Sequence, residues 1–179
     1  KQVSIEGRSH PLPTPFFVMA THYPIEQEGT YPLPEAQIDR FFMKVKIKYP
    51  AYDEEKQILE RMVNEQPIPL QKVLCPKDIE EMREVMHKVY MEEKLKDYIL
   101  HLVNSTRHPE RYPRLNDLKG LIEFGASPRA TIFLARAAKT NAYISGRAYV
   151  IPDDIKMIAK DVLRHRIILS YEAEAEELT

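Results

Sequence analysis

Apolar and polar residues alternate in two stretches of the first fifty residues. Val3 and Ile5 alternate with Ser4 and Glu6 ahead of a turn at Gly7-Arg8. In the second stretch every other position is apolar: Phe41, Met43, Val45, Ile47 and Tyr49. A period of two is typical of strands with one apolar face. The pattern predicts an N-terminal hairpin and a strand over residues 41–49, and the apolar run at 16–20 predicts a buried strand between them.

From residue 53 onward the apolar residues recur every three or four positions, which is the helical period. Helices are predicted from Asp53 until Pro67 stops the first, from Pro76, through residues 95–103, from Ser127 to Gly146, and after Pro152. A short helix is predicted over 34–41, with proline at its first position. We therefore expect a strand-bearing N-terminal part and a helical remainder that divide near residues 70–75.

Composition narrows the class of protein. The chain is 44% hydrophobic and 30% charged, with net charge −1 and a pI near 6.7, which is typical of a globular soluble protein. The balance argues against nucleic acid as the main partner, although Lys44, Lys46 and Lys48 form a small basic stripe. No apolar run approaches the roughly 18 residues that span a bilayer. The single Cys75 excludes an internal disulfide, so a cytoplasmic protein is expected.

Arg129 is the first candidate for a binding site. It lies in the first turn of the helix predicted to begin after Ser127, where the helix dipole disfavours a cation unless an anion shares the site. The Ser127 cap, free backbone N–H groups and the guanidinium would together form a phosphate-binding corner. The alternative is a solvated arginine, which the spacing alone favours.

Arg40 and the segment Thr21-His22-Tyr23 are the other candidates. Arg40 ends a short helix before a strand, so it can project from an edge and neutralise a transferring phosphoryl group on a neighbouring subunit. A surface pair with Asp39 is the alternative. Thr21, His22 and Tyr23 follow the predicted strand 16–20, where polar groups commonly face the ligand crevice of an α/β sheet. His22 and Tyr23 equally suit closing the loop against Pro24.

Other catalytic patterns are absent from the 179 residues. There is no HxxxH pair, no GxSxG and no paired carboxylates in catalytic geometry. There is also no GxxxxGK[ST] loop and no apolar run that ends in Asp-Glu. By itself, the chain therefore has no cradle for a triphosphate.

Three motifs in this order closely resemble the MoxR family of AAA+ ATPases: EGTYPLPEAQIDRFFMKVKIKYP (28–50), GASPRA (125–130) and DVLRHRI (161–167). The resemblance implies an α/β fragment of an AAA+ core with an N-terminal hairpin over residues 1–70. An all-α helical lid over 76–172 and an acidic tail over 173–179 would follow, so that the chain is mainly helical overall.

The resemblance also implies roles for single residues. Arg40 matches the family's arginine finger and Arg129 its sensor-two arginine, which lies beside Ser127. Tyr23 stands where the family usually has the sensor-one asparagine, so Tyr23, His22 or Thr21 would take over the orientation of the attacking water, or hydrolysis would be slow.

The implied activity belongs to an intact parent protein. That parent would form a homo-oligomeric ring, hydrolyse ATP with Mg²⁺, and remodel or mature partner proteins, which in this family often carry von Willebrand factor A domains. The present chain lacks the P-loop, so neither tight cofactor binding nor hydrolysis is expected of it alone. The alternative from another class is a non-catalytic helical interaction module.

Overall fold

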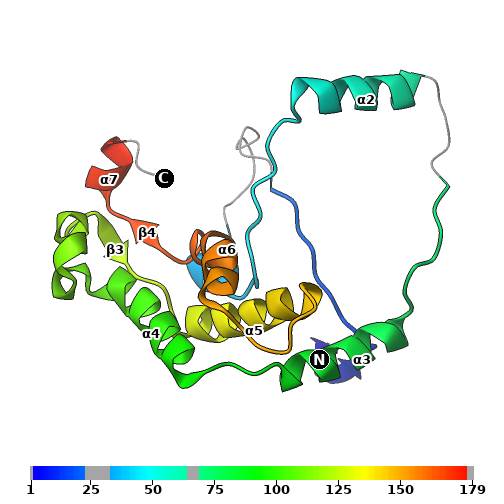
Figure 1. The fold of residues 1–179 in the computed structure, drawn as a ribbon, viewed down its shortest axis with the longest axis horizontal. Helices are drawn as coiled ribbons and strands as arrows, with labels where there is room; N and C mark the ends of the chain where they lie inside the picture. Colours follow the sequence, from blue (N-terminus) through cyan, green and yellow to red (C-terminus); the bar gives the residue numbers. More distant parts are fainter. Residues whose placement is uncertain (1, 23–32, 64–68, 177–179) are drawn as a thin grey trace. The chain divides into compact units, whose positions relative to one another are not determined.

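The computed structural model describes residues 2–22, 33–63 and 69–176. The chain divides into two units, one formed by Lys1–Val18 and Val45–Met82 and the other by Met19–Lys44 and Arg83–Thr179. Helix content dominates, with only short strands, so the prediction of a mainly helical chain is confirmed (Figure 1).

The first unit begins with the predicted hairpin. Strand β1 (Gln2–Ile5) pairs antiparallel with β2 (Arg8–Pro11), and Ile5 lies opposite Arg8. The two-residue turn is Glu6-Gly7, one position earlier than predicted. Both turn residues have positive φ angles, 49° and 79°. This is the geometry of a type I′ turn, whose twist matches that of the strands.

The helix predicted from Asp53 is α2 (Tyr52–Val63), which begins one residue earlier. The backbone N–H of Ala51 donates to Glu54 Oε2 at 2.8 Å and so caps its first turn. The apolar face of α2 is exposed, because no described residue covers it. Its members Ile58, Leu59, Met62 and Val63 are 51–70% exposed. Helix α3 (Pro76–Lys88) starts at the predicted proline and runs from the first unit into the second.

The predictions of strands over 16–20 and 41–49 are wrong. Neither segment forms a strand, and Phe17 and Met19 are each 78% exposed. A strand needs a neighbouring strand to share its backbone hydrogen bonds, and none of the described strands pairs with either segment. Residues 41–44 are instead an irregular segment of the second unit: Met43 packs against the core of that unit, and the Lys44 N–H donates to the carbonyl of Asp161 at 2.8 Å.

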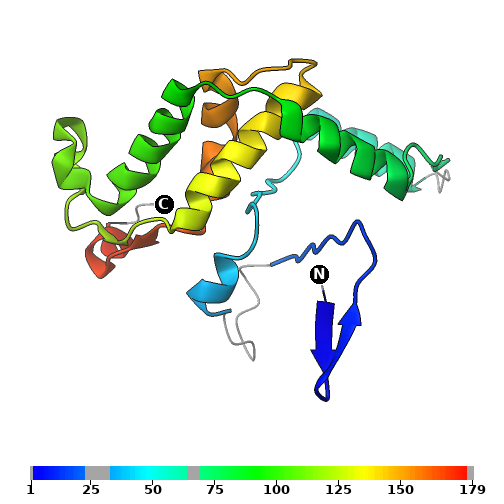
Figure 2. The same ribbon diagram turned by 90° about the horizontal axis from the view of Figure 1, so that it is seen from below.

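The second unit is built on three predicted helices that are confirmed: α4 (Glu93–Arg107), α5 (Pro128–Ile144) and α6 (Pro152–Leu163). Helix α5 packs against both α4 and α6 (Figure 2). Its buried face is rich in alanine, which lets the neighbouring helices approach closely. The largest fully buried apolar side chains of this core are Ile99, Val103, Leu134, Ile155 and Val162.

Several short elements were not predicted. Between α4 and α5 lie the 3-10 helices η1 (Pro109–Arg111) and η2 (Pro113–Leu118) and the strand β3 (Ile122–Phe124). Strand β3 pairs antiparallel with β4 (Ile168–Leu169), and α7 (Tyr171–Ala175) follows. The helical lid expected to be all-α thus contains a small two-stranded sheet. Helix α1 (Glu35–Ile38) is shorter than predicted.

Candidate functional site

The N-terminus of α5 has the capped start that its sequence predicts. Ser127 is the N-cap, and its Oγ accepts a hydrogen bond from the backbone N–H of Arg129 at 3.2 Å. Pro128 occupies the first helical position, where its missing N–H costs nothing. The loop before the cap is fixed by α4, since Thr106 Oγ1 accepts from the Ala126 N–H and Arg107 Nε donates to the Ala126 carbonyl. The start of α5 is therefore held in place by the end of α4.

Gly125 permits this close contact between loop and helix. A Cβ atom at position 125 would lie 2.5 Å from the carbonyl oxygen of Thr106 and 2.7 Å from the Cα of Arg107. Both are backbone atoms, so neither can turn aside. We predict that Gly125→Ala lowers the free energy of unfolding by roughly 1–3 kcal/mol, the usual cost of overpacking. A thermal melt of Gly125→Ala beside the unsubstituted chain measures this loss, and an unchanged midpoint would contradict the clash with the Thr106 and Arg107 backbone.

A carboxylate lies at the start of α5. Asp39 Oδ2 accepts from Arg129 Nη1 at 2.8 Å, and Ser127 Oγ donates to both Asp39 carboxylate oxygens at 2.9 and 3.0 Å. Arg166 Nε donates to Asp39 Oδ1 at 3.1 Å from the other side. Arg129 therefore has the anion that its place at a positive helix end requires. Arg129 is thus both ion-paired with Asp39 and half exposed to solvent, and its role in binding phosphate stays a prediction.

The cluster of Ser127, Arg129, Arg166 and Asp39 keeps Asp39 ionised. Burial alone would raise the pKa of Asp39, but the hydrogen bonds from Arg129 and Ser127 and the charges of Arg166 and Arg129 lower it below its ordinary value. The Arg129 side chain remains 49% exposed, whereas that of Asp39 is 17% exposed. The corner thus holds one anion and still presents a guanidinium to solvent.

Arg40 does not belong to this cluster, unlike Arg129 and Arg166. Its side chain is exposed and makes no hydrogen bond or ion pair with the described residues. The predicted alternative, a surface pair between Asp39 and Arg40, is wrong, because Asp39 binds Arg129 and Arg166 instead. Arg40 is therefore available to a group outside the described chain.

The remaining predicted site residues are not brought to this corner. Thr21 and His22 are exposed, and neither contacts Arg129 or Ser127 through a hydrogen bond. Tyr23 lies outside the described residues. The roles suggested for these three residues stay predictions.

Two contributors were missed by sequence reasoning. Asp39 was considered only as a partner for Arg40, and Arg166 only as a letter of the DVLRHRI motif. Their juxtaposition joins residues 127 positions apart. The sequence did offer a signal for this contact. Asp39 is an acidic residue beside a candidate arginine, and the DVLRHRI motif places arginines at the end of a helix.

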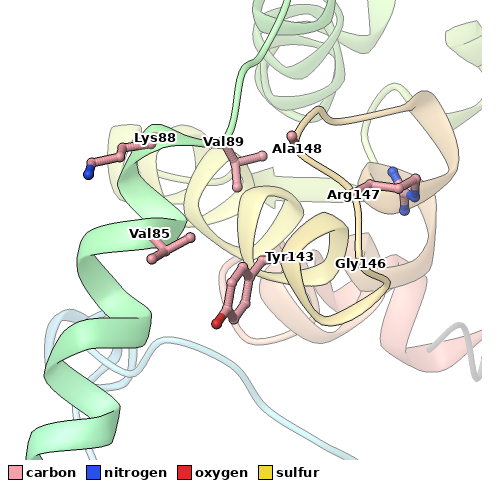
Figure 3. A pocket seen from close by; sticks show the side chains of 7 residues that line it. All are labelled: Val85, Lys88, Val89, Tyr143, Gly146, Arg147 and Ala148. Atoms are coloured by element: carbon pink, nitrogen blue, oxygen red, sulfur yellow. The ribbon is translucent and has the colours of Figure 1, made fainter.

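A pocket of ≈ 310 Å³ lies elsewhere in the second unit, between the end of α3 and the end of α5. The side chains of Val85 and Tyr143 line it, whereas those of Lys88 and Arg147 point away (Figure 3). Ligand sites usually combine an apolar lining with a few convergent polar groups. This pocket lacks that convergence, so the cluster at the start of α5 is the better candidate site.

Within residues 2–22, 33–63 and 69–176, His, Cys, Asp and Glu side chains nowhere gather in a group of three that could hold a metal ion. None of the helices in these ranges combines the length and the apolar character that crossing a bilayer requires.

Two family models match parts of the chain. The AAA lid domain matches residues 117–179, and the ATPase family associated with various cellular activities (AAA) matches residues 1–43. The lid match contains the α5 N-terminus with Ser127 and Arg129. The second match contains Asp39 and Arg40. Both halves of the candidate site therefore lie in regions typical of AAA ATPases.

Individual proteins give the same result over the whole chain. Chaperone MoxR1 of Mycobacterium tuberculosis is 44% identical over 179 residues, which are 100% of this chain and 47% of that protein. The uncharacterised protein YeaC of Bacillus subtilis is 40% identical over 97% of this chain and 52% of its own length. A crystal structure from Cytophaga hutchinsonii, named as a candidate ATPase, superposes with a TM-score of 0.92 and 46% identity, covering 99% of this chain and 54% of that one.

The chain spans about half the length of the relatives that it matches. Matches at both of its ends, and the identity along its whole length, agree with the motifs at 28–50, 125–130 and 161–167. This chain belongs to the MoxR family of AAA+ ATPases.

Proposed function

We propose that the chain forms the sensor, arginine-finger and lid part of an ATP-hydrolysing protein that remodels or matures other proteins. The observation that carries this proposal is the corner at the start of α5, where Ser127 and Arg129 already hold the carboxylate of Asp39. A terminal phosphate presents the same kind of charged oxygen atoms to a helix N-terminus and a guanidinium. The half-exposed Arg129 is free to turn toward one.

Arg40 supplies the second part of the proposal. Its exposed side chain has no partner in the described part of the chain, so it can reach a nucleotide held by a neighbouring subunit. A complete site would lie between two copies, with Arg129 acting in cis and Arg40 in trans. The intact parent would then be a homo-oligomeric ring.

ATP and Mg²⁺ are the proposed cofactors of the intact parent. Ser127 and Arg129 fit the phosphate end of the nucleotide, because both present hydrogen-bond donors there. Mg²⁺ would neutralise charge on the phosphates, and its ligands are proposed to lie in the nucleotide-binding half of the parent. In this chain, Arg129 would bind a γ-phosphate oxygen and so couple the lid helices to the nucleotide state.

The setting proposed for this activity follows the family. A chaperone-like role agrees with the name of the Mycobacterium tuberculosis relative, and proteins with von Willebrand factor A domains are the proposed partners. We place the parent in the cytoplasm and propose no nucleic-acid partner.

The test of this function is the thermal stability of the chain mixed with its nucleotide-binding half. ATP that binds the folded state must raise the midpoint, by an amount equivalent to about 2.7 kcal/mol at one hundred times the Kd. We expect Arg129→Ala to reduce this rise and Arg136→Ala, an exposed arginine further along α5, to leave it unchanged. A midpoint that ignores ATP would contradict the proposal.

The rival function is a non-catalytic interaction module, and the exposed apolar face of α2 favours it. Ile58, Leu59, Met62 and Val63 form a strip that a partner protein could cover. In that case the same mixture would melt at one temperature with or without ATP.

A further prediction concerns Tyr23. An asparagine amide orients water at short range, and a phenol is several ångströms too long to place a donor at the same point. We predict that Tyr23→Asn raises the ATP turnover of the intact parent, measured as released phosphate. An unchanged or lower rate would remove Tyr23 from the account of hydrolysis.

A further inference from the structure

The DVLRHRI motif lies at the end of α6 and contacts the segment that carries Arg40. Arg166 has a fully buried side chain, 0% exposed. Besides its ion pair with the Asp39 carboxylate, Arg166 donates from Nη2 to the carbonyl oxygens of Asp39, at 3.0 Å, and of Phe41. Its Nη1 donates to the carbonyls of Val162 and Phe42. One guanidinium therefore bonds the backbone on both sides of Arg40.

His165 and Asp161 hold the same segment. His165 Nε2 lies 3.1 Å from the carbonyl oxygen of Phe41, so Nε2 carries the donated proton. Burial lowers the pKa of His165, against the opposing effect of that hydrogen bond, and so favours the neutral ring. The carbonyl of Asp161 accepts from the Lys44 N–H. The motif thus bonds the segment at its beginning, middle and end.

Aromatic packing completes this arrangement. The Arg166 guanidinium lies 4.9 Å from the centre of the Phe133 ring, and Phe42 meets that ring edge-on at 5.1 Å. A planar cation that stacks on a ring and donates in a fixed fork cannot be replaced by a lysine without losing some of these contacts. The arginine at position 166 is therefore required by its geometry and not by its charge alone.

We propose that Arg166, assisted by His165, is a positioning residue that fixes the backbone on either side of Arg40, so that Arg40 projects toward a neighbouring copy. Asp39 extends this role, because it binds Arg166 and Arg129 at the same time. The ion pairs Arg129–Asp39 and Asp39–Arg166 therefore connect two proposed roles. Arg129 is proposed to bind the nucleotide of its own subunit, and Arg40, whose flanking backbone Arg166 holds, is proposed to act on the nucleotide of the neighbouring subunit. This inference rests on the proposed role of Arg40.

Displacement of Arg129 toward a phosphate would leave Asp39 paired with Arg166 and Ser127 alone. Charge-assisted hydrogen bonds of this kind are among the stronger polar contacts in proteins. Losing the bond from Arg129 would change how Asp39 holds Arg166. Arg166 in turn bonds the backbone beside Arg40. Nucleotide binding at one site would in this way alter the finger presented to the next site.

The experiment measures ATP turnover and hydrogen exchange in the intact parent. Its variants are Arg166→Met, Arg166→Lys and Asp39→Asn, each alone and combined with Arg40→Ala. Arg164→Met is the matched control, since Arg164 belongs to the same motif but, among the residues that the structure describes, bonds Lys160 and Asp161 and not the segment 39–44. Arg166→Lys keeps the positive charge, so it remains informative if Arg166→Met does not fold.

We expect kcat to fall about 10- to 100-fold in Arg166→Lys, the usual effect of displacing a catalytic group by about 1 Å, with the KM for ATP nearly unchanged. In the Arg40→Ala background the same change should cause no further fall, because Arg166 acts through Arg40. Exchange of the amides of residues 39–44 should quicken while α5 and α6 stay protected. Arg164→Met should leave all three readouts as they were.

Two results would overturn the inference. One is an Arg166→Lys protein whose kcat matches that of Arg164→Met, and the other is a further fall in kcat when Arg166→Lys is added to Arg40→Ala. Failure of the proposed function looks different: Arg40→Ala alone would then leave kcat unchanged, whatever the exchange of residues 39–44 does.

Discussion

Replacing Arg40 with alanine should reduce the ATP turnover of the intact parent by about 10³-fold or more, as removal of an arginine finger does elsewhere. The physical reason is that a guanidinium delivered in trans neutralises charge that grows only in the transition state. Nucleotide affinity should stay nearly constant, because the exposed Arg40 side chain makes no bond to the corner at Ser127 and Arg129. The measurement is kcat beside the Kd for a slowly hydrolysed nucleotide.

Arg136→Ala is the matched control for Arg40→Ala. Arg136 is another exposed arginine of the same unit, so its removal changes the net charge equally and should leave kcat unchanged. A large loss of nucleotide affinity in Arg40→Ala would contradict the assignment in trans, since it would mean that Arg40 binds the ground state.

The second large effect is expected on stability, at Asp154. This carboxylate is 2% exposed and accepts hydrogen bonds from Arg147, from Asn141 Nδ2 at 2.7 Å and from the Ile151 N–H at 2.8 Å. It thereby ties the loop 145–151 to the start of α6. Asp154→Ala removes the acceptor of the Asn141 amide and of the Ile151 N–H and the ion-pair partner of Arg147, so the free energy of unfolding should fall by about 2–4 kcal/mol in a denaturant titration.

The stabilisation by Asp154 should also depend on pH in a known direction. The hydrogen bond from Arg147 lowers the pKa of Asp154 below its ordinary value of 3.8, with help from Ile151 and Asn141 and against burial. A carboxylate whose pKa is lower in the native state than in the unfolded state stabilises the fold at pH values above the unfolded pKa. This stabilisation is lost as the pH falls through the native pKa. The difference in free energy of unfolding between the unsubstituted chain and Asp154→Ala should thus be largest near pH 7 and should shrink in acid below about pH 4.

Asp153→Ala supplies the comparison. Asp153 lies one residue away on α6, but its side chain is 74% exposed and, within the described ranges, its one bonding partner is Lys156. Its removal should change stability little. If both variants melted alike, the hydrogen bonds at Asp154 would not be what holds loop 145–151.

The lid helices could be predicted because each carries its own signals. Ser127 and Pro128 mark the start of α5, Gly146 marks its end, and Pro152 starts α6. These signals act over a few residues, and the apolar period of each helix matches the core that it buries. The predicted hairpin was likewise local, since a two-residue turn fixes its register.

The segments 16–20 and 41–49 show why the rest was not predictable. Their alternation suits a strand, but a strand forms only beside a partner, and none is found in the described part of the chain. The role of Arg166 was missed for a related reason, because it depends on Asp39 being brought to it from 127 positions away. Contacts between distant residues leave no period in the sequence.

The most direct test of the central claim mixes two inactive variants of the intact parent, Arg40→Ala and Arg129→Ala. Each lacks one arginine at every interface, so each alone should hydrolyse ATP poorly. In mixed rings, about a quarter of the interfaces would join an intact Arg129 to an intact Arg40 from the neighbouring copy. We predict that turnover reappears on mixing, whereas a mixture as inactive as its components would contradict a site shared between subunits.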